Sequence, residues 1–367
     1  EEDHMELQYK EQMAQTAERW EAFWAGEVLD RPLVCVTAPK RGHEKTRRWH
    51  GIDYRRVVEA KTEADFQSMM EDFERFAGET AYLGESIPFL SLDYGPDNYA
   101  SYFGAELFCS DTVNTTWVNP IVGEGEWDQF EGKMIKGPGS NYERYMRLLE
   151  YAGKYSEGKF LLSVPDTHSN MDAMSALRGP ENLCYDLMDY PDEVEEALKR
   201  LRATYKPYLD EVYEKANMKN RGSPGGIPTY TKGRFATVQC DFSCLMSPDQ
   251  GKRYVIPSIE EEVSYLNHAS YHYDGKEALV HLDNVLGIKG IDVIQWVPGD
   301  GQPRTLEWMD LLHKIQAAGK GLWLYDWTAE EIKLHFKELK PEKLVFSVDV
   351  ASEDEAEDLL EYLKTHM

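Results

Sequence analysis

Short apolar runs alternate with longer segments of helical periodicity along most of the chain. Eight of these runs have the length and composition of buried strands. They occupy residues 33–37, 87–92, 160–164, 235–240, 269–273, 292–296, 321–325 and 344–348. Because helical segments separate most of them, the pattern predicts βαβ units and a parallel sheet.

The helical segments are most regular at residues 141–155, 192–217, 305–319 and 353–366. A further amphipathic helix is expected at residues 6–25, just before Gly26. Its apolar positions recur at helical spacing: Met13, Ala17, Trp20 and Trp24.

Eight strands without a dinucleotide-binding fingerprint favour a closed barrel over an open sheet. We therefore predict an α/β fold with a single (β/α)8 TIM barrel at residues 31–367, preceded by a helical extension at residues 1–30. Residues 93–140 interrupt the rhythm after the second strand and contain the strand-like run "TTWVNPIV". Such a long insertion at a strand end is expected to help build a site.

Forty basic and 66 acidic residues give a formal net charge of −26. Nucleic acid and anionic membranes repel such a chain, so neither is expected as a partner. We expect a small-molecule substrate, and a homodimer is compatible with the sequence. No run of 18 apolar residues occurs, so no membrane span is predicted.

The N-terminal residues are polar, without the apolar core of an export signal, and a cytoplasmic location is expected. Cysteines are sparse, which fits a reduced compartment, and no CxxC pair occurs. They are Cys35, Cys109, Cys184, Cys240 and Cys244. A basic segment at residues 40–48, which includes Arg41, is either a solvated loop or a loop that grips an anion beside the site.

In a barrel the site lies at the carboxyl ends of the strands, where polar and aromatic residues gather in this sequence. The acid and base candidates are Asp93, Asp166, His168, Asp241 and His272. Each aspartate is equally able to cap a helix or hold a loop. The candidates for substrate contact are Arg41, Tyr94, Tyr271, Gln295, Trp296, Asp326 and Trp327. The tryptophans could form a flat apolar wall, although Trp323, within its strand, is expected to fill the core.

The stretch "YHYDG" places His272 and Asp274 two residues apart at the end of a strand. Side chains at this spacing point to the same face, so the two provide half of a metal site. Cys244 or Asp349, from neighbouring strand ends, could complete it. The alternative is a core histidine that Asp274 holds without a metal.

Four segments together resemble the uroporphyrinogen decarboxylase superfamily over about residues 85–350. They are "LSLDYGPDNYASYFGAEL", "DTHSNMDAMSALRGPENLCYDLMDYPDEVEEAL", "CDFSCLMSPDQ" and "YHYDGKEALVHLDNVLGIKGIDVIQWVPGDG". The resemblance implies a (β/α)8 barrel. It also implies one of two chemistries, porphyrinogen decarboxylation or cobalamin-dependent methyl transfer between a corrinoid protein and a thiol.

The chain departs from both patterns. After the first strand it reads "VTAPKRGHEKTRRWH", basic but without the decarboxylase's Met-Arg-Gln-Ala-Gly-Arg-Tyr pattern. Where the methyltransferases bind zinc through His-x-Cys and a later cysteine, this chain has His272-x-Asp274 and Asp349. Oxygen in place of sulfur makes a harder metal site.

Three hypotheses follow. The first is a methyltransferase of one-carbon metabolism that uses Zn²⁺ or another divalent metal and a corrinoid carried by a partner protein. The second is a decarboxylase of a carboxylated substrate, such as a tetrapyrrole, in which residues 40–48 hold the carboxylates and Asp93 stabilises charge or protonates the product. The third is a non-catalytic, ligand-binding barrel.

Overall fold

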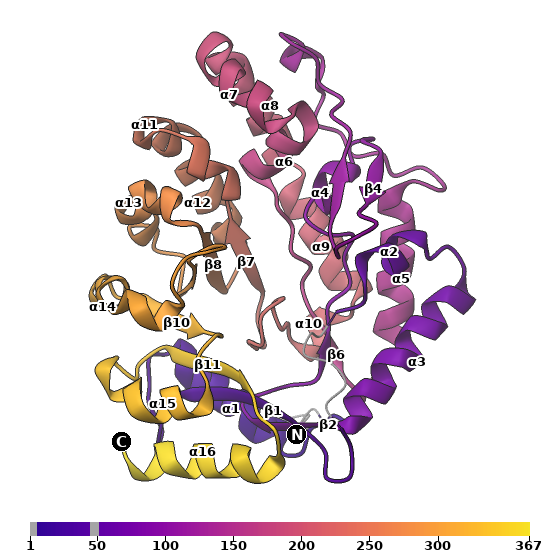
Figure 1. The fold of residues 1–367 in the computed structure, drawn as a ribbon. Coiled ribbons are helices and arrows are strands. Elements are labelled where there is room, and N and C mark those ends of the chain that lie inside the picture. The colour runs from indigo at the N-terminus through magenta and orange to yellow at the C-terminus, as the bar shows by residue number, and fades with distance from the viewer. Residues whose placement is uncertain (1–5, 45–50) are drawn as a thin grey trace.

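The structure is a computed structural model that describes residues 6–44 and 51–367. All eight predicted strands form, and they run parallel where they pair (Figure 1). They are β1 (Leu33–Pro39), β3 (Phe89–Leu90), β6 (Leu161–Leu162), β7 (Phe235–Gln239), β8 (His268–Asp274), β9 (Val293–Val297), β10 (Gly321–Leu324) and β11 (Leu344–Asp349). The predicted parallel α/β architecture is confirmed.

The predicted closure of the barrel is wrong for the described strands. One sheet has the order β2-β1-β11-β10-β9-β8-β7, whereas β3 and β6 pair only with each other. The strand β2 (Thr80–Gly84) is antiparallel to β1 and occupies the edge that a closed barrel gives to its second strand. At the other gap, the two-residue β6 makes no ladder with β7. The eight parallel strands therefore surround a hollow without one continuous ring of hydrogen bonds.

Helices cover the outer face of the strands, as the periodicity predicted. They are α2 (Tyr54–Glu59), α3 (Glu63–Glu79), α5 (Asn141–Tyr155), α6 (Asn170–Arg178), α7 (Pro180–Asp189), α8 (Pro191–Arg202), α9 (Tyr205–Lys215), α10 (Met218–Arg221), α11 (Pro248–Gln250), α12 (Ile256–Ser264), α13 (Leu282–Leu286), α14 (Met309–Ala317), α15 (Ala329–His335) and α16 (Glu353–Thr365). The shorter helical turns are η2 (Asp241–Leu245), η3 (Gly251–Val255), η4 (Lys276–His281), η5 (Thr305–Trp308) and η6 (Phe336–Glu338).

The helix predicted at 192–217 is two helices, α8 and α9, separated at Ala203 and Thr204. Pro207 explains the break, because it has no N–H to bond the carbonyl of Ala203. The hydroxyl of Thr204 donates instead to the carbonyl of Leu201, at 2.6 Å.

The N-terminal helix α1 (Met13–Trp24) closes the amino ends of the strands. It begins later than the predicted residue 6 and ends before Gly26, which has a φ of +77°. Trp20 is fully buried, and the indole N–H of Trp24 donates to the carbonyl of Tyr230 at 2.7 Å. These rings pack with inward-facing strand residues such as Phe235, so the hollow is sealed at this end.

The insertion at residues 93–140 contains α4 (Asn98–Ser101), the antiparallel strands β4 (Leu107–Cys109) and β5 (Thr116–Val118), and η1 (Trp127–Gln129). Only three residues of the strand-like run at 115–122 pair as a strand. The N–H groups of Ile121 and Val122 both donate to the carbonyl of Leu177 in α6, which ties the insertion to that helix. Among the described residues, no helix has the length and apolar character needed to cross a membrane.

Candidate functional site

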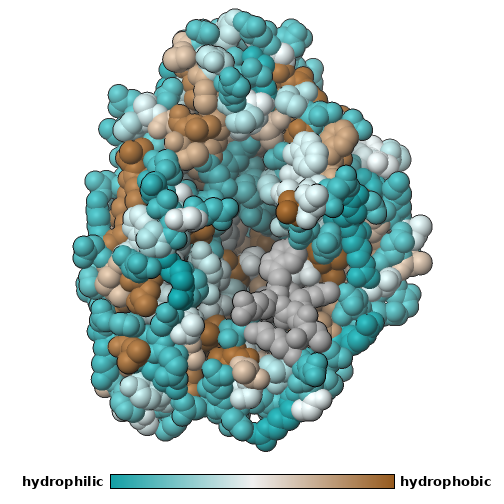
Figure 2. Space-filling view, in the orientation of Figure 1, coloured by the Kyte–Doolittle hydropathy of each residue, from teal (hydrophilic) through white to brown (hydrophobic). Residues whose placement is uncertain are grey.

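A cavity of about 430 Å³ opens among the carboxyl ends of the strands. The molecule is visibly hollowed there, with largely hydrophilic side chains around the hollow (Figure 2). Its polar and aromatic lining includes Thr37, Tyr54, Asp93, Asp166, Gln239, His272, Gln295, Trp323, Tyr325, Ser347 and Asp349. The volume suits a small ligand.

His272 reaches this cavity from β8, as the alternation of the strand predicted. Its Nδ1 lies 2.8 Å from Oε1 of Gln295, which is its register partner on β9. An amide oxygen can only accept, so Nδ1 carries a hydrogen, and in the neutral imidazole the lone pair is then on Nε2. Tyr271 and Tyr273 point to the opposite face of β8, where both are buried.

A first group of possible metal ligands consists of Asp241, His272 and Asp274. One ligand atom from each lies within 4.8 Å of the others. Asp241 follows β7 directly and comes next to β8 because the two strands pair in parallel. The sequence predicted two of these three residues as ligands and assigned Asp241 to acid or base chemistry.

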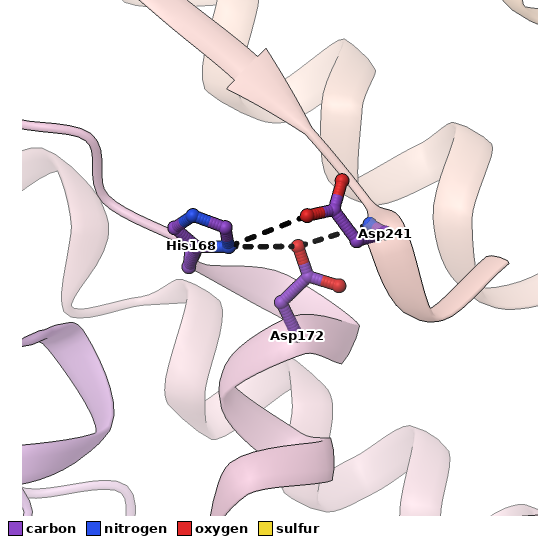
Figure 3. Close-up of side chains that lie close together, drawn as sticks. All are labelled: His168, Asp172 and Asp241. Atoms are coloured by element: carbon purple, nitrogen blue, oxygen red, sulfur yellow. Dashed lines mark hydrogen bonds and ion pairs between the residues drawn. The ribbon is translucent and has the colours of Figure 1, made fainter. Parts of the chain in front are cut away.

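A second group consists of His168, Asp172 and Asp241, and it also has its ligand atoms within 4.8 Å. The three side chains point toward one another from the loop after β6, from α6 and from the end of β7 (Figure 3). Nδ1 of His168 lies 3.6 Å from Asp172 and 3.8 Å from Asp241. Asp241 therefore belongs to both groups.

His168 is surrounded by carboxylates. Its Nε2 also lies 3.1 Å from Asp166. Burial alone would lower the pKa of His168, but the charge of Asp166 and the bonds to Asp166 and Asp172 raise it well above the ordinary value. A proton on His168 is thus the positive charge that this acidic cluster holds when no cation is bound.

Two carboxylates of the site, Asp93 in the cavity lining and Asp241 in both ligand groups, have pKa values near neutrality. Burial raises the pKa of Asp93 to about 7, although its carboxylate accepts a hydrogen bond from the N–H of Gly95. Burial and then the charge of Asp172 raise the pKa of Asp241 to about 7. Groups with such values can give or take a proton near physiological pH. This property accords with the predicted acid–base roles but does not test them.

A buried glutamate supports the loop that carries His168. Glu262 of α12 accepts hydrogen bonds from Ser169 Oγ at 2.5 Å and from Asn170 Nδ2 at 3.1 Å. His168 and Asn170 have φ values of +36° and +56°, which side-chain-bearing residues rarely adopt. These hydrogen bonds help to hold a strained turn, as functional sites often require.

The donor set fits a divalent cation. Imidazole nitrogen and carboxylate oxygen are ordinary ligands of zinc and of harder divalent ions. The hydrogen bond from His272 to Gln295 is the kind of supporting contact that orients a metal-binding imidazole.

Two predicted metal ligands lie outside both groups. Asp349 lines the cavity and accepts a hydrogen bond from the hydroxyl of Thr37. Cys244 is exposed on η2, and burial of its sulfur together with nearby carboxylates raises the pKa of its thiol. Among the described residues, neither has its ligand atom within either group.

Several predicted substrate contacts lie away from the cavity. Tyr94, Tyr271, Trp296 and Trp327 are buried in the core. Asp326 accepts a hydrogen bond from the N–H of Thr305 at 2.9 Å. Arg41 is exposed and pairs with Asp354 at 2.8 Å, while residues 45–50 of the basic segment lie outside the described residues. Of this set, Gln295 lines the cavity.

Other cavity residues were missed. Trp323 belongs to a buried hydrophobic cluster, as expected, but it also lines the cavity, as does Tyr325 directly after β10. The alternation of side chains along a strand is the feature of the sequence that bears on these assignments. Because neighbouring side chains point to opposite faces, Trp296 must face outward once Gln295 faces inward. Gln239 and Tyr54 also line the cavity, and Tyr54 had no distinguishing feature in the sequence.

No family model and no curated protein matches this chain. Among solved structures, the fold is similar to that of a methyltransferase from Methanosarcina mazei, with a TM-score of 0.58 at 13% sequence identity. The alignment covers 96% of this chain and 98% of that chain. At this identity the similarity shows a shared α/β fold along nearly the whole length, and membership of the superfamily stays a prediction.

Proposed function

We propose that the protein is a methyltransferase with a divalent metal at the Asp241, His272 and Asp274 group. The observation that carries the proposal is the position of this group beside a small-molecule cavity at the carboxyl ends of parallel strands. The overall similarity to a methyltransferase supports the reaction class by fold analogy.

The residues take distinct roles in this proposal. Asp241, Asp274 and Nε2 of His272 hold the metal, and Gln295 fixes the imidazole tautomer. The metal would supply Lewis acidity at the atom that gives or takes the methyl group. His168, with its raised pKa, holds a proton next to Asp241 and balances the charge of Asp166 and Asp172.

The methyl carrier in this proposal is a corrinoid on a partner protein, as the sequence resemblance implies. A cavity of about 430 Å³ accommodates a small substrate. A corrin macrocycle is much larger, so it would approach the mouth while the substrate lies inside.

Decarboxylation is the second candidate, favoured by the buried Asp93 and its pKa of about 7, which suits proton delivery to a product carbanion. It requires cationic groups for the substrate carboxylates. Among the described residues, no lysine or arginine lines the cavity. Lys45, Arg47 and Arg48 of the basic segment lie outside the described residues.

The third hypothesis, a non-catalytic barrel, expects polar side chains that do not converge. The two groups of metal-ligand residues that share Asp241 do converge.

A methyl-transfer assay tests the proposal. Zinc-loaded protein is mixed with methylcobalamin and a panel of thiols and amines, and loss of the cobalt–methyl absorbance is followed. We expect turnover with the wild type and at least a hundredfold loss with Asp274→Ala. The matched control is Glu277→Ala, at an exposed carboxylate in η4 three residues further along, which should keep turnover. A metal-loaded protein that demethylates no methylcobalamin with any acceptor contradicts the proposal. Release of CO₂ from carboxylated substrates would favour the second candidate.

A further inference from the structure

The cavity has a second half whose chemistry differs from that of the metal-ligand group. Trp323 of β10 and Tyr325, which follows the strand directly, line it, and their rings stack with centroids 5.2 Å apart. Tyr54 adds a third aromatic side chain. Strand β6, which pairs with β3, lies across the opening from β10 (Figure 1). The aromatic pair therefore faces a wall built by a different part of the chain.

That wall is acidic. Asp93 and Asp166 follow β3 and β6, and Asp349 at the end of β11 also lines the cavity. Burial, and then the charges of Asp93 and Asp166, raise the pKa of Tyr54, which places its phenol within the field of both carboxylates.

Positive charge is scarce in this lining. Within residues 6–44 and 51–367, no lysine or arginine lines the cavity, and no salt bridge involves Asp93. His168 is the cation beside Asp166, but Asp172 and Asp241 share its charge. A ligand that enters this half therefore meets carboxyl groups and aromatic faces, with no lysine or arginine beside them among the described residues.

Trp323 supplies an independent sign that the aromatic half of the cavity binds a ligand. Its side chain is only 7% exposed, and its indole N–H has no hydrogen-bond partner among the described residues. An unpartnered buried donor costs free energy, which a ligand with an acceptor oxygen can offset.

We propose that the aromatic half of the cavity binds an organic cation, a methylated ammonium group, as the substrate moiety held next to the metal-ligand group. Aromatic faces attract such cations through the ring quadrupole, and carboxylates attract them by charge. Methyl groups leave a quaternary ammonium without N–H donors, so stacked rings are a better match for it than a set of hydrogen-bond acceptors.

This inference rests on the proposed function only in calling the cation a substrate. Binding itself requires no metal and no corrinoid. As a methyl donor, a quaternary ammonium would pass one methyl group to the corrinoid and leave as a tertiary amine, and only that product nitrogen has a lone pair for the metal. The two proposals can therefore fail separately.

Isothermal titration calorimetry with choline tests the inference, with its uncharged tert-butyl analogue and ethanolamine as comparison ligands. We expect choline to bind at least tenfold more tightly than either. Equal binding of the uncharged analogue would show an apolar pocket only. Tighter binding of ethanolamine would show a site for protonated primary amines, and no binding of choline at millimolar concentration would remove the cation site. Each of these three results overturns the proposal.

Variants locate the site. Tyr325→Leu and Trp323→Leu should weaken choline binding at least tenfold, whereas Trp117→Leu, which changes a half-exposed tryptophan outside the cavity, should not. Trp323→Phe keeps an aromatic face and should retain most of the affinity, which guards against loss through misfolding. Unchanged affinity in Tyr325→Leu and Trp323→Leu would overturn the assignment.

The same titration on chelator-treated protein and on Asp274→Asn separates the two proposals. We expect choline to bind in both cases. A wild type that holds no zinc after incubation with it but still binds choline would remove the proposed metal centre and leave the cation site. Metal binding without choline binding would remove the cation site and leave the proposed metal centre.

Discussion

Nδ1 of His272 and Oε1 of Gln295 lie 2.8 Å apart on neighbouring, register-paired strands. Of the two neutral tautomers of His272, this hydrogen bond selects the one in which Nε2 has a lone pair. The neutral imidazole therefore does not need to rotate or change tautomer before it binds a metal. Its orientation comes from two strands of the sheet, which are among the most rigid parts of the fold.

Removing this supporting contact should weaken metal binding. Gln295→Leu leaves His272 free to rotate and to change tautomer, so we expect a 10- to 100-fold lower zinc affinity. Competition with a chromophoric chelator measures this affinity. Gln302→Leu, in the loop that follows the same strand, serves as the matched control. Equal affinities for Gln295→Leu and Gln302→Leu would show that the contact does not orient a ligand.

Asp93 should make the protein less stable as the pH rises. Its pKa is about 7 in the folded protein and 3.8 ordinarily, so the folded state binds more protons between these values. The free energy of unfolding therefore falls as the pH rises from about 4 to about 7, and this contribution is constant above that range.

Asp93→Asn should remove this pH-dependent loss of stability, and its amide oxygen keeps an acceptor for the N–H of Gly95. Relative to the wild type, the variant should be more stable at pH 8 than at pH 5 by roughly 2–3 kcal/mol, since each pKa unit corresponds to about 1.4 kcal/mol. Urea denaturation at both pH values measures the difference. A stability difference that does not change with pH would contradict the assignment.

Glu262 should matter for both stability and activity. Glu262→Ala removes the acceptor of Ser169 Oγ and Asn170 Nδ2, which should cost about 1–3 kcal/mol and loosen the turn that carries His168. We expect a lower kcat and an altered pH profile of methyl transfer, because the environment of His168 changes. Glu260→Ala, at an exposed position on the same helix, is the control. A stability loss with an unchanged pH profile would leave Glu262 a purely structural role.

The closure of the hollow by α1 should be essential to the fold. Trp20 is fully buried, and its indole N–H donates to the carbonyl of Glu85 at 3.2 Å. Trp20→Ala should lower the free energy of unfolding by about 3–5 kcal/mol. Trp117→Ala, at a half-exposed ring, should cost less than about 1 kcal/mol. Similar losses for the two variants in chemical denaturation would argue against α1 as part of the core.

The sequence predicted the strands well because each is a short apolar run with its own helical partner. It could not predict that the barrel is open. The strand β2 is an ordinary extension of the α3 segment, and only its antiparallel pairing with β1 reveals that the edge is occupied. Pairing between distant segments depends on tertiary packing, which local patterns do not contain.

The candidate site was predictable in part for a related reason. Alternation along β8 correctly placed His272 toward the cavity, whereas Tyr271, expected as a substrate contact, points to the opposite face of the strand. Alternation does not by itself tell which face of β9 points inward, and Trp296, expected as a substrate contact, is buried in the core while Gln295 lines the cavity. The position of Asp241 next to Asp274 follows from the parallel register of β7 and β8, which a single sequence does not fix.

Metal analysis of the purified protein tests the central claim most directly. Mass spectrometry is applied to the wild type, to Asp274→Ala, and to Glu277→Ala as the matched control after each has been incubated with zinc and desalted. The account predicts near-stoichiometric metal in the wild type and in Glu277→Ala, and a loss of most of it in Asp274→Ala. A wild type that stays metal-free, or an Asp274→Ala variant that keeps its full metal content, would contradict the assignment of Asp241, His272 and Asp274 as a metal centre.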